Sequence, residues 1–263
     1  MNSQLQSGLK LLNAISPQPS TSNPRPKKKT QEVISLFSPD DPLVIGFGHK
    51  RGSGKDTSAG YFCKHYQAER IAFADPIKAL TMVAYGLDRD QAYGDQKERT
   101  DPFWDVSPAE LQQVEGTELH RKRLAEIFPQ KFGNQNIWVR MARRRIEEGE
   151  SSFYVISDLR FPNEADMVKE LDGFCIRVDC DFETRMRRTG GNFEGRDDDH
   201  YSEVALDDFT GWDFIVDNNG SEDDLKRGLE TVIRQVPVEK GIRKNGNNWQ
   251  NPPEEHVSVS VGI

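Results

Sequence analysis

The sequence has few cysteines, no long apolar segment and no excess of positive charge. Its three cysteines, Cys63, Cys175 and Cys180, are scattered without metal-ligand spacing, and we expect the last two inside a protein of a reducing compartment. No apolar run approaches the roughly 18 residues of a membrane-spanning helix. The N-terminal segment also lacks the apolar core of a secretory signal. A cytoplasmic location without a membrane partner is therefore predicted.

The charge balance favours a soluble globular protein. The net charge is −8, and charged residues make up 30% of the chain. No nucleic-acid partner is expected from this balance, and the basic clusters at 27–29 and 140–145 are interpreted as solvated faces. The 263 residues suffice for one sizeable α/β domain with a small lid or insertion.

Both ends of the chain have compositions typical of flexible segments. Residues 1–40 are rich in proline and serine and poor in large apolar side chains, which predicts a flexible N-terminal extension. Residues 237–263 are rich in asparagine, proline and glycine and are predicted as a flexible tail. The globular domain is therefore placed at residues 41–236.

The most informative stretch is a glycine-rich loop between a predicted strand and a predicted helix. The segment Gly46-Phe-Gly-His-Lys-Arg-Gly-Ser-Gly-Lys-Asp-Thr57 follows the apolar run 42–45 and precedes a helix-compatible segment at 58–66. This context predicts a P-loop, whose backbone N–H groups surround phosphate oxygens at a helix N-terminus. We assign six residues to the phosphates of ATP: Gly52, Ser53, Gly54, Lys55, Asp56 and Thr57. Lys55 is also a catalytic candidate, because its charge can follow the transferred phosphoryl group.

The motif departs from the usual P-loop pattern. Five positions before Gly54 stands His49 in place of a glycine. Either the loop is one residue longer than usual, or Gly52 provides the sharp turn. Asp56 occupies the usual position of the magnesium-binding hydroxyl, and Thr57 follows it. The alternative is a plain glycine turn with a solvated lysine.

Alternating strand and helix signals predict the architecture. Apolar strand segments occur at 70–73, 152–156, 173–178 and 212–216, and helical segments at 74–85, 111–128, 137–148 and 222–234. This alternation predicts an α/β fold with a doubly wound, mostly parallel sheet, in the three-layer sandwich of P-loop NTPases. A helical substrate-side insertion is placed at about 86–135 and a short lid at about 185–203.

Several polar residues have both functional and structural interpretations. Asp158 follows the strand at 152–156, where ligands bind in open α/β sheets, and it could meet magnesium or pair with Arg160. Arg185, Arg187 and Arg188 precede a glycine-rich loop that suits a closing lid or a plain surface loop. Asp75 and Lys78 could be only a helix cap and an exposed first-turn cation.

An ordered series of short blocks resembles phage-type deoxynucleoside monophosphate kinases over about residues 43–235. The blocks are Lys50-Arg51 with Ser53–Thr57, Ala74–Lys78, Leu111-Gln112 with Gly116–Glu118, Trp138-Val139, Asp158-x-Arg160 with Glu164-Ala165, His200-x-Ser202-Glu203, and Asn219–Ser221 with Leu225. The additional Gly52, and Val114-Glu115 before Gly116, depart from the family pattern. Both terminal extensions lie outside the resemblance.

The resemblance implies ATP and Mg²⁺ as cofactors and a deoxynucleoside monophosphate as acceptor. Its implied acceptor-binding residues are Lys50, Arg51, Asp75, Lys78, Gln112, Trp138, Arg160 and Glu164. Trp138 would stack on the base. Arg160 and Asp158 would join Lys55 in catalysis, and Thr57 and Asp158 would hold magnesium through water. Arg187, Asn219 and Gly220 would contact ATP.

Two other functions stay open at this point. One is a P-loop kinase for another small phosphorylated metabolite, and the other is a non-catalytic ATP-binding module that regulates assembly through its basic N-terminal segment. A viral source would place the protein in the host cytoplasm. The sequence specifies neither base preference nor oligomeric state, and a homodimer stays open.

Overall fold

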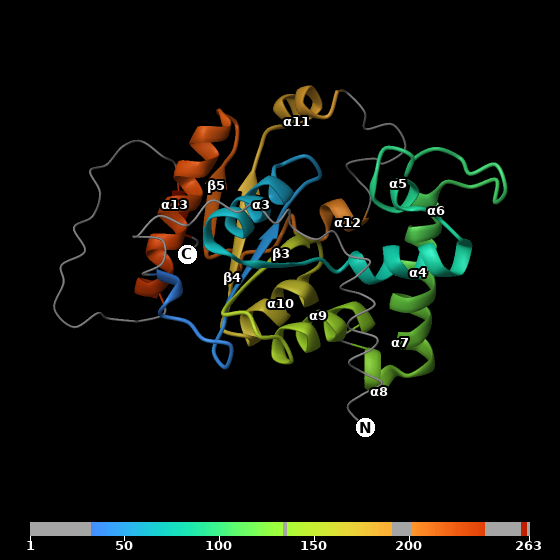
Figure 1. Cartoon of the computed structure of the whole chain (residues 1–263), viewed down its shortest axis with the longest axis horizontal. Helices are drawn as coiled ribbons and strands as arrows, with labels where there is room; N and C mark the ends of the chain where they lie inside the picture. The colour runs from blue at the N-terminus through green and yellow to red at the C-terminus, as the bar shows by residue number, and fades with distance from the viewer. Residues whose placement is uncertain (1–32, 134–135, 191–200, 240–258, 262–263) are drawn as a thin grey trace. The chain divides into compact units, whose positions relative to one another are not determined.

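The computed structural model describes residues 33–133, 136–190, 201–239 and 259–261 (Figure 1). The described residues divide into two compact units, each described by itself: an α/β unit that includes residues 33–71 and 146–190, and a helical unit that includes residues 72–133 and 136–145. Residues 201–239 and 259–261 also belong to the α/β unit. The helical unit covers a longer range of residues than the insertion predicted at 86–135. Most of the predicted N-terminal extension, residues 191–200 of the predicted lid and residues 240–258 of the predicted tail lie outside the described residues.

The α/β unit contains a six-stranded sheet with the order β2-β3-β1-β4-β5-β6. Its strands are β1 Leu43–Gly48, β2 Glu69–Ile71, β3 Phe153–Leu159, β4 Phe174–Asp179, β5 Phe214–Asp217 and β6 Val259–Val261. The first five strands are parallel, and β6 pairs antiparallel with β5, in the register Ile215 to Ser260. The predicted fold class, an α/β sandwich with a mostly parallel sheet, is confirmed.

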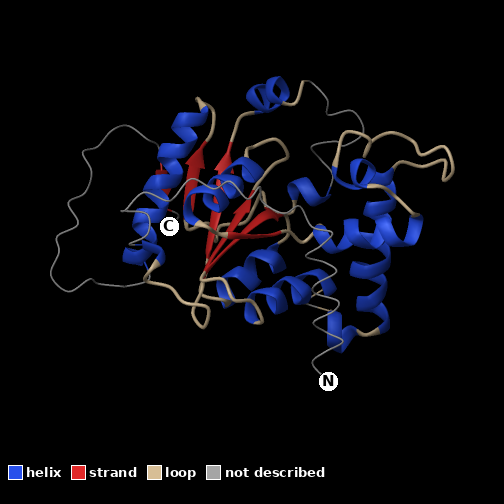
Figure 2. Cartoon of the chain, in the orientation of Figure 1, coloured by secondary structure: helices blue, strands red, loops and turns tan. Residues whose placement is uncertain are grey.

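Five described helices belong to the α/β unit, and Figure 2 shows them in blue beside the red strands. They are α3 Lys55–Tyr66, α10 Pro162–Glu170, α11 Phe182–Arg188, α12 Tyr201–Val204 and α13 Glu222–Glu239. Ser221 caps α13 as predicted, because its hydroxyl accepts the Asp224 N–H at 3.2 Å.

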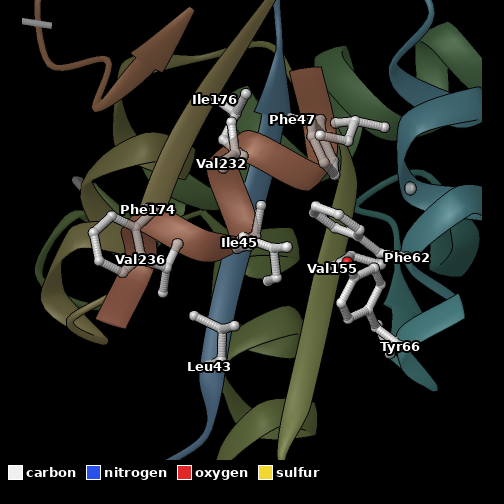
Figure 3. Packing of buried hydrophobic residues seen from close by; sticks show 14 of the residues in the cluster. Leu43, Ile45, Phe47, Phe62, Tyr66, Val155, Phe174, Ile176, Val232 and Val236 are labelled. Atoms are coloured by element: carbon white, nitrogen blue, oxygen red, sulfur yellow. The ribbon is translucent and has the colours of Figure 1, made fainter. Parts of the chain in front are cut away.

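Strand periodicity determines which side chains enter the main core. Successive residues of a strand point to opposite faces, so Leu43, Ile45 and Phe47 share one face of β1. On that face they pack with Phe62 of α3 and Val232 of α13 in one buried cluster (Figure 3). On the other face a Cβ at Gly46 would lie 3.1 Å from a methyl carbon of Val168 in α10. Helices therefore cover both faces of β1, which fixes the strand end that precedes the P-loop.

The C-terminal part of the domain extends further than predicted. Helix α13 continues past the expected end at residue 234, through Pro237 to Glu239. The reason is apolar burial in its last turns, where Val232, Ile233 and Val236 belong to the main core. Strand β6 lies within the segment predicted as a flexible tail, so that prediction is wrong for residues 259–261.

The helical unit consists of short helices joined by tight connections. They are α4 Asp75–Tyr85, α5 Arg89–Tyr93, α6 Pro108–Gln113, the π-helix η1 Val114–Arg123, α7 Leu124–Ile127, α8 Pro129–Phe132 and most of α9 Ile137–Glu147. Capping boxes begin α5 and α6 at Asp88 and Ser107. The helix predicted at 111–128 is thus continuous but π-helical in its middle. No helix of the described residues is long and apolar enough to cross a membrane.

Candidate functional site

The glycine-rich loop follows β1 and leads directly into α3. Strand β1 ends at Gly48 and lies between β3 and β4, while α3 begins at Lys55. Ligands of open α/β sheets bind beyond the carboxyl ends of strands, where the connections lead to opposite sides. The N-terminus of α3 adds backbone N–H groups that have no helical partner and a favourable partial charge for anions. The fold thus places the loop where an anion would bind.

The spacing of His49 and Gly54 determines the length of the loop, and three residues of the loop have a positive φ angle. His49 has φ +104°, Gly52 has φ +76° and Gly54 has φ +107°. Four residues separate His49 from Gly54, so the loop has the usual P-loop length, and His49 occupies the position of the first glycine. Gly52 provides an additional left-handed turn without lengthening the loop. A histidine held at positive φ is strained, which is typical of ligand-binding backbone.

The ammonium group of Lys55 closes the loop on itself. It donates to the carbonyls of His49 at 2.7 Å and Lys50 at 2.6 Å, and the side chain is buried. Burial and the nearby Arg160 charge lower the pKa of Lys55 to about 7, against the opposing effect of Glu203, Asp56 and Asp158. A buried cation at this place is poised for an anionic ligand.

Two side chains from other elements brace the loop. Asn218 Nδ2 donates to the Ser53 carbonyl at 2.7 Å, and the Arg185 guanidinium donates to the Arg51 carbonyl at 3.2 Å. With the Lys55 contacts, four carbonyls of the loop, those of His49, Lys50, Arg51 and Ser53, have side-chain donors. The Ser53 hydroxyl is buried without a hydrogen-bond partner and adds a further polar group. These features fit a phosphate chain.

An acidic residue of α12 connects the loop with a predicted substrate arginine. Glu203 pairs with the Arg160 guanidinium, and its other oxygen accepts the Arg51 N–H at 2.7 Å. Lys50 Nζ donates to the Glu203 carbonyl at 2.9 Å and pairs with Asp207 at 2.6 Å. Burial raises the pKa of the Glu203 carboxyl, but Arg160, the Arg51 hydrogen bond and Lys55 together hold it below its usual value.

The segment after β3 differs in detail from the prediction. Asp158 lies within β3, which runs to Leu159, so the strand ends three residues later than expected. Buried Glu164 accepts the N–H groups of Arg160 at 2.9 Å and Phe161 at 3.2 Å, which fixes the backbone at the start of α10. The catalytic and acceptor roles of Asp158, Arg160 and Glu164 stay predictions.

The predicted lid arginines have different environments. Arg185 is buried and braces the P-loop, whereas Arg187 is exposed and donates to the Thr184 hydroxyl at 3.4 Å. Arg188 donates to the carbonyls of Asn218 at 2.7 Å and Gly220 at 2.8 Å. It therefore supports the loop of Asn219 and Gly220, whose contacts with ATP stay predictions. Residues 191–200 between α11 and α12 lie outside the described part of the chain.

Four predicted acceptor residues belong to the helical unit. Lys78 Nζ lies 4.5 Å from the Tyr93 ring centre, and Gln112 donates to the Ala92 carbonyl at 3.0 Å, so both contact α5. Trp138 is buried, and its indole N–H donates to the Gly116 carbonyl of η1 at 2.8 Å. Asp75 is buried as the first residue of α4, and because Ala74 is the N-cap, the cap interpretation of Asp75 is wrong.

The predicted metal ligands receive no independent support from residue clustering. Thr57 is exposed in the first turn of α3, and Asp158 is partly buried in β3. Among the described residues, no group of three or more His, Cys, Asp or Glu side chains could hold a metal ion. Magnesium ligation through water by Thr57 and Asp158 stays a prediction.

Three site residues were not assigned a role from the sequence: His49, Asn218 and Glu203. His49 was recognisable only as the residue that replaces a motif glycine. Glu203 lay in a block of the resemblance, His200-x-Ser202-Glu203, without a role. Asn218 adjoins the Asn219-Gly220 turn, but its contact with Ser53 spans 165 residues, and no local signal indicates it.

A named relative shows the family to which this chain belongs. No protein-family model matches the chain. A protein of Acanthamoeba polyphaga mimivirus named "putative deoxynucleotide monophosphate kinase" is 34% identical over 185 residues, which cover 67% of this chain and 89% of that protein.

Two solved structures have partial similarity to this chain. A "putative kinase" from Chloroflexus aurantiacus is 11% identical with a TM-score of 0.43 and is matched over 78% of this chain and 99% of its own. TT1252 from Thermus thermophilus is 18% identical with a TM-score of 0.45, over 74% and 98%. On the strength of the mimivirus relative, whose sequence is matched over nearly its whole length, the chain belongs to the kinase family of that protein.

Proposed function

We propose that this protein is a deoxynucleoside monophosphate kinase. It would transfer the γ-phosphoryl group of ATP to the 5′-phosphate of a deoxynucleoside monophosphate, giving ADP and a deoxynucleoside diphosphate. The observation that carries the proposal is the buried Lys55 ammonium inside a P-loop of usual length. The mimivirus relative, by its name, supports the choice of acceptor.

The loop supplies the groups that a triphosphate needs. Its carbonyls are held by side chains, and the N–H groups of Gly52, Gly54 and the first turn of α3 would bind phosphate oxygens. Lys55 would stay with the γ-phosphate as negative charge develops on the β–γ bridging oxygen of ATP, which becomes a terminal oxygen of ADP. Bound Mg²⁺, held through water by Thr57 and Asp158, would neutralise part of the phosphate charge.

The α/β unit also contributes cations for the acceptor phosphate. Lys50 and Arg51 belong to the loop itself, and Arg160 lies at the carboxyl end of β3. Phosphoryl transfer requires little covalent chemistry from a protein, because positioning and charge neutralisation provide most of the rate enhancement. We propose that Arg160 holds the acceptor phosphate for attack on the γ-phosphorus. Lys78, which is partly exposed, would contact the nucleoside part, whereas Asp75, Gln112 and Trp138 are buried.

A nucleotide panel tests the proposal. The full chain is incubated with ATP and Mg²⁺ and with each of the four deoxynucleoside or ribonucleoside monophosphates, and ADP formation is followed by a coupled assay. We expect ADP formation to require a deoxynucleoside monophosphate, with a preference among the bases. Turnover with none of them, but with another phosphorylated metabolite, would favour the rival kinase function. ATP binding without any acceptor-dependent turnover would favour a regulatory module.

A further inference from the structure

Glu203 is the point at which α12 meets the P-loop and β3. Its side chain is only 3% exposed, and one carboxylate oxygen pairs with Arg160 while the other accepts the Arg51 N–H at 2.7 Å. These two partners are 43 and 152 residues away in the sequence. A single carboxylate thus connects the loop assigned to ATP with the arginine assigned to the acceptor.

The pairing restricts the guanidinium of Arg160 without using all of its donors. Arginine has five N–H donors in a planar fork. Its Nη1 donates to Glu203 and, at 3.5 Å, to the Ser202 carbonyl. Nε and Nη2 have no hydrogen-bond partner in the described part of the chain. One edge of the fork is therefore anchored, and another edge can bind a phosphate.

Burial of the Glu203 carboxylate fixes the orientation of the Arg160 guanidinium. A buried carboxylate is tolerated only when it is paired and hydrogen-bonded, so Glu203 holds Arg160 and the Arg51 amide in fixed positions. A guanidinium anchored on one edge keeps its orientation, and the ordering of its side chain is complete before a ligand arrives. Misplacing a substrate-positioning group by about 1 Å can reduce the rate on the order of 100-fold.

We propose that Glu203 is a positioning residue that orients Arg160 toward the acceptor phosphate and aligns it with the P-loop. This inference rests on the proposed kinase function. Glu203 itself touches no substrate in this proposal, and it acts through Arg160 and the Arg51 amide. Asp207, four residues after Glu203, pairs with Lys50 at 2.6 Å, so this ion pair between the segment and the loop does not depend on the Glu203 carboxylate.

A double-mutant cycle separates this role from a general structural one. We expect Glu203→Gln to lower kcat/KM for the acceptor about 10- to 100-fold, mostly through kcat, and Glu203→Asp to retain more activity. In an Arg160→Ala background the same Glu203→Gln change should cost less than about 3-fold, because the group it orients is absent. Asp208→Asn removes one carboxylate from the same segment at an exposed position and should leave activity unchanged.

The measurement is steady-state kinetics of the full chain and its variants, with thermal unfolding to confirm that each variant is folded. Equal losses from Glu203→Gln in both backgrounds, or a loss of stability that Glu203→Asp does not reverse, would overturn the positioning role alone. Wild-type protein that turns over with no deoxynucleoside monophosphate would instead overturn the proposed function, and the inference with it.

Discussion

At the scale of single residues, the glycine-rich loop combines a strained histidine with a buried lysine. His49 has φ +104°, a conformation that is readily accessible only to glycine, and its carbonyl accepts the Lys55 ammonium at 2.7 Å. A residue held in a sparsely populated region costs about 1–3 kcal/mol, which the surrounding structure must offset. The His49 side chain stays neutral near pH 7, because burial and the charge of Arg177 lower its pKa to about 4. His49 therefore adds no cation to the loop.

The pKa of Lys55 leads to a prediction about protons. In the free protein it is lowered from 10.5 to about 7, first of all by burial, so Lys55 is mostly neutral at pH 8.5. Phosphate oxygens would favour the ammonium form, and ATP binding at about pH 8.5 should therefore take up close to one proton. Titration calorimetry in buffers of different ionisation enthalpy measures this uptake. Lys55→Met should abolish it, and zero uptake by the wild-type protein would contradict the proposed contact.

The same shift has a consequence for stability. Between pH 7 and 10.5 the unfolded chain binds more protons at Lys55 than the folded chain does. Without nucleotide, the contribution of Lys55 to the free energy of unfolding therefore rises with pH through this window. Chemical denaturation at several pH values, compared with Lys55→Met, isolates this contribution.

At the scale of elements, the β5–α13 connection supports the glycine-rich loop from a distant part of the chain. Asn218 is buried, its side chain donates to the Ser53 carbonyl, and its own N–H donates to the Asp179 carbonyl at 2.7 Å. Gly54 leaves room for this contact, since a Cβ there would lie 2.3 Å from Asn218 Nδ2. The end of β5 and the start of α3 are thus packed together at the loop.

Asn218→Asp tests this brace with almost no change in shape. The aspartate cannot donate to Ser53, and its carboxylate would face a carbonyl in a buried place. We expect the free energy of unfolding to fall by about 1–3 kcal/mol and ATP to bind more weakly, as measured by denaturation and calorimetry. The exposed Asn219→Asp, whose side chain donates to Asp217 at 2.6 Å, is the comparison for stability, where we expect a smaller loss. Unchanged stability in Asn218→Asp would contradict the brace.

Sequence signals were sufficient where local chemistry decides the structure. The strand–loop–helix at 43–66, the cap at Ser221 and the alternation of strands and helices follow from short-range patterns. Packing between distant segments determines the features that the sequence did not predict. Helix α13 continues to Glu239 because its last turns bury apolar side chains, and β6 forms by pairing with β5. Similarly, the contacts of Glu203 and Asn218 with the loop join segments more than 150 residues apart.

In the helical unit, the type of helix could not be predicted from the sequence. Its residues 111–127 have the composition expected of a helix, but residues 114–123 are π-helical. At Gly116 a Cβ would lie 2.7 Å from Ile77 Cδ1, so the absence of a side chain lets η1 approach α4 closely. The Gly116 carbonyl also accepts a hydrogen bond from the Trp138 indole N–H. Helix propensity contains no information about these tertiary contacts, and π-helical turns often occur at functional sites.

At the scale of the whole molecule, the α/β unit is formed by two separate stretches of the sequence. The α/β unit is interrupted after β2, and the helical unit follows before β3 begins. The α/β unit contains every residue assigned to ATP, together with Lys50, Arg51, Arg160 and Glu164 of the acceptor set. The remaining acceptor residues, Asp75, Lys78, Gln112 and Trp138, lie in the helical unit.

The central claim is that Lys55 of the P-loop serves phosphoryl transfer to a deoxynucleoside monophosphate. The most direct test follows the label of γ-labelled ATP into a deoxynucleoside diphosphate. It compares wild-type protein with Lys55→Ala and with Lys64→Ala, an exposed lysine of the same helix. The proposal predicts label in the diphosphate with wild type and Lys64→Ala, and a loss on the order of 100-fold or more with Lys55→Ala. Near-normal transfer by Lys55→Ala, or label released only as inorganic phosphate, would contradict it.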